Sequence, residues 1–474
     1  MLFTFTLFND IHKLYGQSFI FVYREDNVRM KWFIFIATVC FSCVAKSQGI
    51  FQIRDDKPVS FKFELVNNVV LVPLTINGMP FSFLLDTGVK ETILFVNAED
   101  SLYLNNQNKM KFRGIGIEEG VDGILSTDNV VEVGDVAVDS LHWLYVIQGT
   151  ELDISSDIGV AINGILGSKF FNSFAVNVDY QKQRITLFPP GYNYEKSIRK
   201  YKYIPLTLEN ERPYITANML VDTTWTGGKM LVDMGNTAPL MLFSFLLSDF
   251  HIKEPYVEEY IGRGFNGAVY GKRNRIRKVA LEDFVLDYPI VAYPDSNALF
   301  MSKLAENRIG SVGNQVLQRF HLLIDYRNDA LYLRKNKKFA KPFLLNMAGI
   351  EVRHDGMIWR KEWVKTAPQK KQEHQMKPDQ GITINLANDA FQYTFVLQPT
   401  YRIAGVRKNS PAAEAGIQSG DMLLKVNGKS VGILTLPKIM TALQSRPGET
   451  IRLTLQRGDE QYDTRFLLVD PIPF

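Results

Sequence analysis

Cysteine is nearly absent from the sequence, and its scarcity limits the chemistry that the chain can perform. Only Cys40 and Cys43 occur among the 474 residues, and both lie in one apolar stretch near the N-terminus. If that stretch is removed, neither a thiol nucleophile nor a cysteine-based zinc site remains. An exported protein without disulfides must then be held together by its hydrophobic core.

A large excess of one charge and the common metal-binding motifs are missing as well. The formal net charge is only +4, which is too small to indicate nucleic-acid binding by electrostatics. The six histidines show no metal-ligand spacing, and the HExxH motif of zinc proteases is absent. The glycine-rich stretch 113–120 does not fit a phosphate loop. We therefore expect no nucleic-acid partner, no metal and no organic cofactor.

Only one long hydrophobic run is present, over residues 32–44 (WFIFIATVCFSCV), directly after Met30 and Lys31. It is shorter than the roughly 20 residues that a membrane-spanning helix needs. A basic start, an apolar core and small residues predict a signal peptide over 30–49, cleaved after Ala45 or Gly49. Residues 1–29 would be an upstream extension or a wrongly assigned start. A buried segment is the alternative. We expect an exported chain with no transmembrane span once the signal is removed.

An internal repeat with a period near 147 residues dominates the rest of the sequence. Residues 83–88 (FLLDTG) match 230–235 (MLVDMG), and 164–167 (GILG) match 310–313 (GSVG). The distance from Asp86 to Gly167 is 81 residues, and that from Asp233 to Gly313 is 80. Markers that keep this register over long segments indicate a duplicated lobe. We expect the two lobes at residues 60–195 and 200–335.

The residues within each repeat favour strands. Phenylalanine and tyrosine are abundant, with 32 and 20 copies, and both residue types suit pleated sheets. Apolar residues alternate or run together over short stretches that end at glycine or asparagine, as in Val131–Val138 and Arg184–Phe188. Each repeat is therefore predicted to be a mostly β lobe.

Each repeat also carries one carboxylate at the end of an apolar strand, Asp86 in the first and Asp233 in the second. Two such groups can meet on a pseudo-twofold axis, where adjacent carboxylates cannot both ionise readily. The ionised group can deprotonate a water while the protonated group donates to a substrate carbonyl. Such a pair would hydrolyse peptides without a covalent intermediate. Asp179 and Asp325 recur too, but their strand-end position favours bonding to local backbone.

The sequence FLLDTG at 83–88, followed about 80 residues later by Ile165-Leu166-Gly167, resembles the aspartic peptidases. The short lobes are similar to retropepsin halves, and their fusion is similar to pepsin. By this resemblance Asp86 and Asp233 are the catalytic pair. Thr87 would reach across to the opposite lobe, and Gly88 and Gly235 would permit a tight turn beneath each carboxylate. The flap that covers bound peptide would lie in 111–123 or 260–271.

The composition changes after Leu333. Residues 334–341 (RKNKKFAK) and 360–374 are basic, and the part between them reads as two short strands around Asp355-Gly356. We expect a basic linker with a hairpin over 336–380. Residues 401–428 (YRIAGVRKNSPAAEAGIQSGDMLLKVNG) resemble a bacterial PDZ domain, here expected over 381–474. This resemblance implies capture of an extended peptide or a protein C-terminus as an added strand. A module that only docks on the lobes is the alternative.

The combination resembles exported bacterial aspartyl-protease-like proteins with a C-terminal PDZ domain. It implies a mostly β fold, in which a bilobal acid-protease-like β-barrel duplication precedes an α+β PDZ-like domain. The expected activity is that of an aspartic endopeptidase acting on peptides or proteins in the periplasm or cell envelope, or after secretion. We expect a monomer, because the duplication supplies both carboxylates.

Met234 departs from the family pattern, which has threonine or serine after the second aspartate. A methionine side chain cannot donate the cross-lobe hydrogen bond. The departure leaves open a catalytically impaired peptide-binding or scaffold protein of the cell envelope. A structural adaptor that binds anionic surfaces through its basic linkers is a further alternative.

Overall fold

The computed structural model describes most of the chain from Gly49 onward. The predicted signal peptide, apart from Gly49, and residues 1–29 lie outside the described residues. Among the described residues, no helix is both long and apolar enough to cross a membrane. All of them belong to one compact unit, Gln48–Phe474. They are residues 49–96, 102–112, 121–148, 154–221, 223–247, 250–264, 267–296, 304–363, 383–386 and 393–473.

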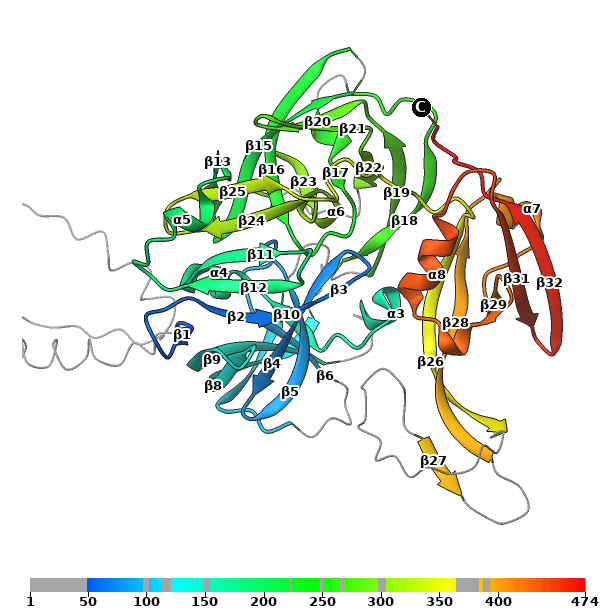
Figure 1. The fold of residues 1–474 in the computed structure, drawn as a ribbon, viewed down its shortest axis with the longest axis horizontal. Coiled ribbons are helices and arrows are strands. Elements are labelled where there is room, and N and C mark those ends of the chain that lie inside the picture. The colour runs from blue at the N-terminus through cyan, green and yellow to red at the C-terminus, as the bar shows by residue number, and fades with distance from the viewer. Residues whose placement is uncertain are drawn as a thin grey trace, which may run out of the picture. The chain divides into compact units, whose positions relative to one another are not determined.

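The first half of this unit is built on a nine-stranded sheet (Figure 1). Its strand order is β1-β9-β6-β10-β5-β4-β8-β7, and β3 pairs with β4. Its apolar strand residues form much of the buried core. The strands are β1 (Gln52–Ile53), β3 (Glu64–Val66), β4 (Val69–Ile76), β5 (Met79–Leu85), β6 (Ile93–Val96), β7 (Gln107–Phe112), β8 (Val121–Val133), β9 (Ala137–Gln148) and β10 (Gly164–Leu166).

The second half repeats this arrangement in a ten-stranded sheet with the order β18-β19-β22-β17-β23-β16-β15-β20-β21, and β14 pairs with β15. The parallel pairs β5–β10 and β6–β9 of the first half correspond to the parallel pairs β16–β23 and β17–β22. The duplication is therefore confirmed in strand pairing as well as in sequence. The strands are β14 (Thr207–Glu209), β15 (Arg212–Leu220), β16 (Trp225–Asp233), β17 (Leu240–Leu242), β18 (Val257–Gly264), β19 (Gly267–Arg275), β20 (Lys278–Leu281), β21 (Phe284–Asp287), β22 (Ile290–Pro294) and β23 (Arg308–Gly313).

A six-stranded sheet joins the two halves, with the order β13-β25-β24-β11-β12-β2. At its centre β11 pairs antiparallel with β24, and Val176 lies opposite Ile324. Both residues belong to one hydrophobic cluster that draws on both halves. The shared core fixes the two lobes against each other. The strands of this sheet are β2 (Val59–Lys62), β11 (Ala175–Asp179), β12 (Arg184–Phe188), β13 (Lys202–Pro205), β24 (Phe320–Asp325) and β25 (Ala330–Lys335). The short helices of the two halves are α3 (Ile154–Ile158), α4 (Ser168–Ser173), α5 (Glu195–Ile198), η2 (Ser244–Leu246) and α6 (Asn314–Leu317).

The predicted strands are confirmed in one case and corrected in the other. The strand predicted over Arg184–Phe188 is β12, with the same bounds. The single strand predicted over Val131–Val138 is wrong, because β8 ends at Val133 and β9 begins at Ala137. Gly134 and Asp135 between them have φ values of +59° and +58°. These left-handed conformations form a hairpin turn that reverses the chain.

A seven-stranded sheet and two helices form the C-terminal part of the unit. Ser410 caps the start of α7, because its Oγ accepts a hydrogen bond from the Ala413 N–H at 3.3 Å. Residues from β26 and from α8 share one buried cluster with the later strands. The elements are β26 (Ile350–Trp363), β27 (Thr383–Leu386), β28 (Tyr393–Val406), α7 (Pro411–Glu414), β29 (Met422–Val426), β30 (Lys429–Ser430), η5 (Val431–Ile433), α8 (Leu436–Leu443), β31 (Thr450–Arg457) and β32 (Glu460–Leu467).

The hairpin predicted around Asp355-Gly356 is wrong. Residues 350–363 form one strand, β26, which pairs with β28 on both sides of this dipeptide. The pairing shifts register between His354 and Met357, and Gly356 has φ of +98°. The glycine therefore accommodates a bulge and not a turn, because β28 is long enough to pair with the whole strand. Residues predicted as linker thus belong to the C-terminal sheet.

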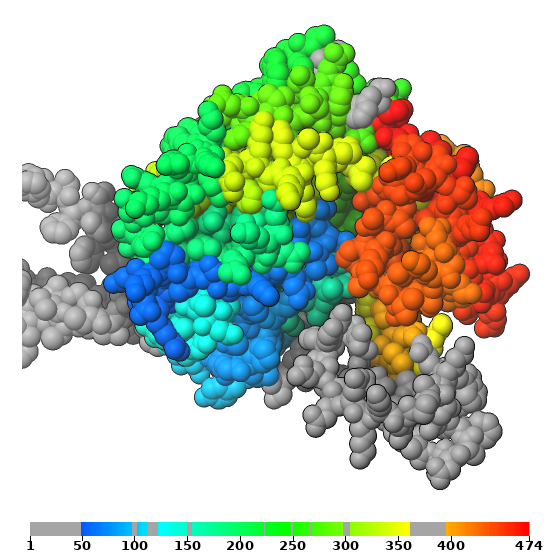
Figure 2. Space-filling view, in the orientation of Figure 1, coloured from blue at the N-terminus to red at the C-terminus, as the bar shows by residue number. Residues whose placement is uncertain are grey.

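The basic segment after β25 is fixed to the second lobe (yellow in Figure 2). Nη1 of Arg319 donates to the carbonyl oxygens of Lys338 and Phe339, each at 3.1 Å. The guanidinium carbon of Arg319 lies 3.6 Å from the centre of the Phe343 ring. Phe343 is in the same hydrophobic cluster as the two lobes. The first part of the predicted linker is therefore packed chain.

Candidate active site

The two predicted carboxylates occupy equivalent positions at the ends of equivalent strands. Asp86 follows β5 directly, and Asp233 is the last residue of β16. Each of these strands pairs parallel with a short strand, β10 or β23, that ends beside the carboxylate. The backbone N–H of Asp86 donates to the Leu166 carbonyl at 3.0 Å. The duplicated fold thus holds both aspartates on rigid strand ends.

The structure brings Asp86 and Asp233 together at the boundary between the lobes. Oδ1 of Asp86 accepts hydrogen bonds from the N–H of Gly88 at 2.7 Å and from the N–H of Gly235 at 3.1 Å. Gly235 belongs to the opposite lobe, so this contact crosses the boundary. Oδ1 of Asp233 accepts from the N–H of Asn236 at 3.0 Å. Backbone N–H groups therefore fix the orientation of both carboxylates.

Gly88 and Gly235 leave the space that the two carboxylates need. A Cβ atom at Gly88 would lie 3.1 Å from Oδ1 of Asp233 and 3.2 Å from Oδ1 of Asp86. A Cβ atom at Gly235 would overlap Oδ2 of Asp86. Neither glycine has φ in the left-handed range. Close approach of the carboxylates, and not a left-handed backbone, is therefore what requires glycine at these two positions.

Thr87 makes the predicted cross-lobe contact and is fully buried. Its hydroxyl donates to the Val232 carbonyl at 2.6 Å and accepts from the Met234 N–H at 3.1 Å. Met234, at the equivalent position of the second lobe, is also fully buried and packs in the shared hydrophobic cluster. The interlock between the two lobes at this point therefore consists of the Thr87 hydroxyl from the first lobe and the apolar packing of Met234 from the second.

The two carboxylates differ in their electrostatic surroundings. Burial, followed by the charge of Asp233, raises the pKa of Asp86 from 3.8 to about 7. Burial also raises the pKa of Asp233, but the Arg308 guanidinium, the Ser311 hydroxyl and backbone N–H groups oppose this rise. Because adjacent buried carboxylates cannot both ionise readily, the pair shares a proton at mildly acidic pH.

The raised pKa of Asp86 predicts that the protein loses stability as the pH rises. The folded state binds the Asp86 proton up to about pH 7, whereas the unfolded chain releases it near pH 4. Stability falls wherever the native state binds more protons. We expect the melting temperature to drop by a few degrees between pH 5 and pH 8. Thermal unfolding of the parent and of Asp86→Asn measures this drop, which should be smaller in the variant. Equal slopes would contradict the raised pKa.

Three polar residues near the carboxylates were not predicted from the sequence. Arg308 and Ser311 lie on β23, beside Asp233, and Arg212 at the start of β15 acts on Asp86 electrostatically. An alignment of the two repeats could have found the first two. In this alignment Ser311 corresponds to Ile165, and Arg308 corresponds to a second apolar residue, Ile162.

The two stretches predicted to hold a flap are both hairpins at their bases. In the second lobe β18 pairs with β19 from Val257 opposite Arg273 to Gly264 opposite Gly267. In the first lobe β7 pairs with β8, and Phe112 is opposite Val121. The tips of both hairpins, 113–120 and 265–266, lie outside the described residues.

Asp179 and Asp325 cap turns, as predicted. Oδ1 of Asp179 accepts from the N–H groups of Gln181 and Lys182 at 3.0 Å and 3.1 Å. Oδ1 of Asp325 accepts from the Arg327 N–H at 3.0 Å. Both residues lie at the ends of central strands of the shared sheet, β11 and β24. Their carboxylates are thus engaged by backbone and play a structural role.

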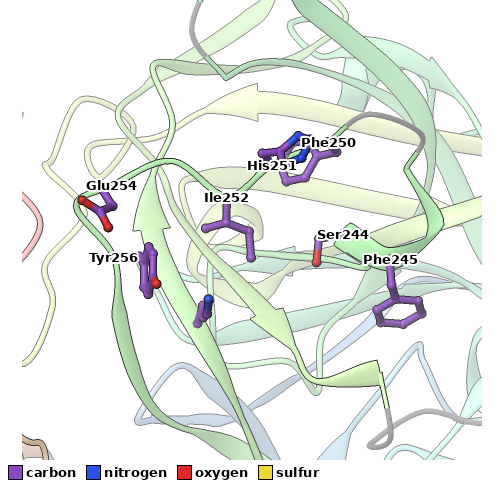
Figure 3. A pocket seen from close by; sticks show the side chains of 8 residues that line it. Ser244, Phe245, Phe250, His251, Ile252, Glu254 and Tyr256 are labelled. Carbon is purple, nitrogen blue, oxygen red and sulfur yellow. The ribbon is translucent and has the colours of Figure 1, made fainter.

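A shallow pocket of about 530 Å³ lies elsewhere on the second lobe (Figure 3). Figure 3 shows Glu254 and Tyr256 at one end and Ser244 and Phe245 at the other. None of the predicted site residues lines it. The pocket is wide open, and it is distinct from the carboxylate pair.

Two known families match segments of this chain. An aspartyl protease family matches residues 72–170, and a PDZ domain family matches residues 402–457. The chain therefore contains an aspartyl protease-like domain and a C-terminal PDZ domain, as the sequence resemblance implies. Asp86, Thr87 and Gly88 lie in the first segment, whereas Asp233 lies outside both.

Short stretches are also similar to curated proteases. A "Probable CtpA-like serine protease" of Staphylococcus haemolyticus is 36% identical over 63 residues, which is 13% of this chain and 13% of that protein. The protein of the same name from Staphylococcus saprophyticus is 39% identical over 62 residues, again 13% of each chain. That from Staphylococcus aureus is 38% identical over 58 residues, 12% of each. The chain thus matches only about an eighth of the length of these relatives.

Proposed function

We propose that this protein is an aspartic endopeptidase in which Asp86 and Asp233 activate water between two lobes. The observation that carries the proposal is the meeting of two buried carboxylates from duplicated strands, with Gly235 of one lobe bonded to Asp86 of the other. The different surroundings of the two groups supply an acid and a base in one site. This division of roles is what hydrolysis without a covalent intermediate requires.

The proposed reaction needs only this pair, a water and a peptide bond. Asp233 takes a proton from the water, whose oxygen attacks the peptide carbonyl carbon, while Asp86 gives its proton to the carbonyl oxygen. The resulting gem-diol then returns one hydroxyl proton to Asp86, and Asp233 passes its proton to the leaving nitrogen. The C–N bond breaks, the two products are a carboxylic acid and an amine, and both aspartates regain their starting states.

Cleavage of peptides by the purified full chain tests the proposal. A mixed peptide library is incubated from pH 3 to pH 8, and products are identified by mass spectrometry. We expect cleavage that weakens above about pH 7, because Asp86 then loses the proton it must donate. Binding of peptides without cleavage at any pH would contradict an enzyme and favour a peptide-binding protein.

The PDZ domain and the export of the chain belong to the same proposal. We propose that the PDZ domain presents substrates or partners by binding an extended peptide or a protein C-terminus. We further propose that the chain is exported to the periplasm or envelope of a bacterium through the signal peptide at 30–49. The disulfide-free composition of residues 50–474 is compatible with export because the lobes share a large core.

The serine chemistry named for the similar staphylococcal proteases is not transferred here. The likeness spans at most 63 residues of this chain. The G-x-S-x-G match at 428–432 lies within the PDZ segment, where Ser430 ends the short strand β30 and its hydroxyl accepts from the Gly432 N–H at 3.3 Å. This is not the strand-to-helix elbow that exposes a nucleophilic serine. The aspartic mechanism rests on the two carboxylates and on the aspartyl protease segment at 72–170.

Replacing Met234 by threonine separates a working enzyme from an impaired one. Met234 is fully buried, so truncation should lower the free energy of unfolding by about 2 kcal/mol. Activity should stay within about threefold of the parent, because Thr87 already bonds the Val232 carbonyl and the Met234 N–H on either side of Asp233. Peptidase assays and thermal unfolding measure both effects. A gain in activity above tenfold would instead show that methionine disables the parent cleft.

A further inference from the structure

The second lobe contains a polar pair that the first lobe lacks. The pairing of β5 with β10 places Leu84 opposite Ile165, and that of β16 with β23 places Leu231 opposite Ser311. Because Asp86 corresponds to Asp233, Ser311 is the counterpart of Ile165. Three residues earlier, Arg308 corresponds to Ile162, and both isoleucines are buried. At these two positions the segment beside Asp86 is therefore apolar, whereas the segment beside Asp233 is polar.

A bulge in β23 brings Arg308 and Ser311 to the same face. Residues three apart on a regular strand point to opposite faces. Here Lys229 pairs with Arg308 and the next residue, Met230, pairs with Gly310, so Ile309 is an extra residue. Such a bulge changes the direction of the neighbouring side chain. As a result Nη2 of Arg308 donates to Oγ of Ser311 at 2.8 Å.

Arg308 is held in place by further contacts. Its Nε donates to the Gly310 carbonyl at 3.0 Å, and its guanidinium carbon lies 5.2 Å from the centre of the Phe243 ring. Tyr214 on β15 also contacts the guanidinium. A guanidinium has donors only, so Ser311 must accept from it and is left to donate its own hydrogen. Ser311 pairs with Leu231, which is two residues before Asp233 and on the same face of β16, so its hydroxyl is directed toward the Asp233 carboxylate. There it opposes the burial that raises the pKa of Asp233.

We propose that Arg308 and Ser311 form a relay that keeps Asp233 ionised, so that Asp86 carries the shared proton. This inference rests on the proposed function, and Arg308 and Ser311 are positioning residues in it. Other charged or titratable groups face the pair: Arg212 and Tyr326 near Asp86, and Tyr214 beside Arg308. Among the described contacts, none of these three groups donates a hydrogen bond to the Asp233 carboxylate. The relay therefore breaks the symmetry of the duplicated site.

The relay is tested by the pH profile of kcat/KM for the full chain carrying Arg308→Met, Ser311→Ala or Ser311→Thr. Loss of the guanidinium or the hydroxyl should move the acidic limb upward by about one pH unit, because Asp233 then holds its proton more tightly. At pH values below the acidic limb of the parent, kcat/KM of these two variants should therefore be about tenfold lower than that of the parent. Ser311→Thr keeps the hydroxyl and should behave as the parent.

Arg319→Met serves as the matched control. Arg319 lies in the same lobe and holds backbone carbonyls of the packed segment after β25, so its loss should lower stability without moving the pH profile. A uniform loss of activity in Arg308→Met, with both limbs unmoved, would show a merely structural role and overturn the relay.

A titration that needs no activity keeps the relay testable if the proposed function fails. In the full chain labelled with carbon-13 at aspartate carboxyls, the resonances of Asp86 and Asp233 are assigned with Asp86→Asn and Asp233→Asn. We expect Asp233 to ionise at lower pH than Asp86 in the parent, and at higher pH in Arg308→Met and Ser311→Ala. A parent in which Asp86 ionises first would overturn the relay, whether or not any peptide is cleaved.

Discussion

Replacing either Asp86 or Asp233 by asparagine should lower kcat/KM by about a thousandfold or more. Asparagine has nearly the same shape but can neither accept a proton from water nor return one, and positioned acid–base groups contribute factors of this size. Because the two carboxylates share one proton, the double variant should lose little beyond either single variant. Steady-state cleavage of a peptide substrate measures each loss.

Asp179→Asn provides the control for this experiment. Asp179 also ends a strand of the duplicated fold, β11, but its carboxylate caps a local turn by accepting from the Gln181 and Lys182 N–H groups. We expect full activity in that variant. Cleavage that survives in both Asp86→Asn and Asp233→Asn would contradict the paired-carboxylate mechanism. Loss in one variant alone would mean that only one aspartate acts chemically.

Replacing Thr87 by valine should destabilise the protein by about 3 kcal/mol and lower activity at least tenfold. The substitution keeps the shape of the side chain but removes its hydroxyl. The Val232 carbonyl and the Met234 N–H, which the hydroxyl bonds at 2.6 Å and 3.1 Å, are then left buried without this partner. Unsatisfied buried backbone groups each cost about 1–3 kcal/mol. A shift of the two strand ends also separates the carboxylates.

Urea unfolding and peptide cleavage measure the two effects of Thr87→Val. The hydroxyl is retained in Thr87→Ser, so that variant should keep most of the stability and activity. An unchanged unfolding midpoint in Thr87→Val would mean that the interlock between the lobes depends on apolar packing, including that of Met234, and not on this hydroxyl.

The sequence by itself determined the duplication, the strand character and the identity of the two carboxylates. Apolar periodicity is a local property, and a repeat keeps its register wherever the chain folds twice in the same way. The match between 83–88 and 230–235 therefore located Asp86 and Asp233 without coordinates. The Ser410 cap and the turns at Asp179 and Asp325 were predictable for the same reason, because each involves neighbouring residues.

Only the tertiary structure decided the features that depend on partners distant in sequence. The stretch around Asp355-Gly356 has the sequence of a hairpin, but pairing with β28 makes it one bulged strand. Gly88 and Gly235 are needed because the opposite lobe brings a carboxylate against them, which no local pattern shows. The contact of Arg308 with Ser311 likewise depends on how β16 pairs with β23 across a bulge. Close packing between segments far apart in the chain, and not local preference, set each of these outcomes.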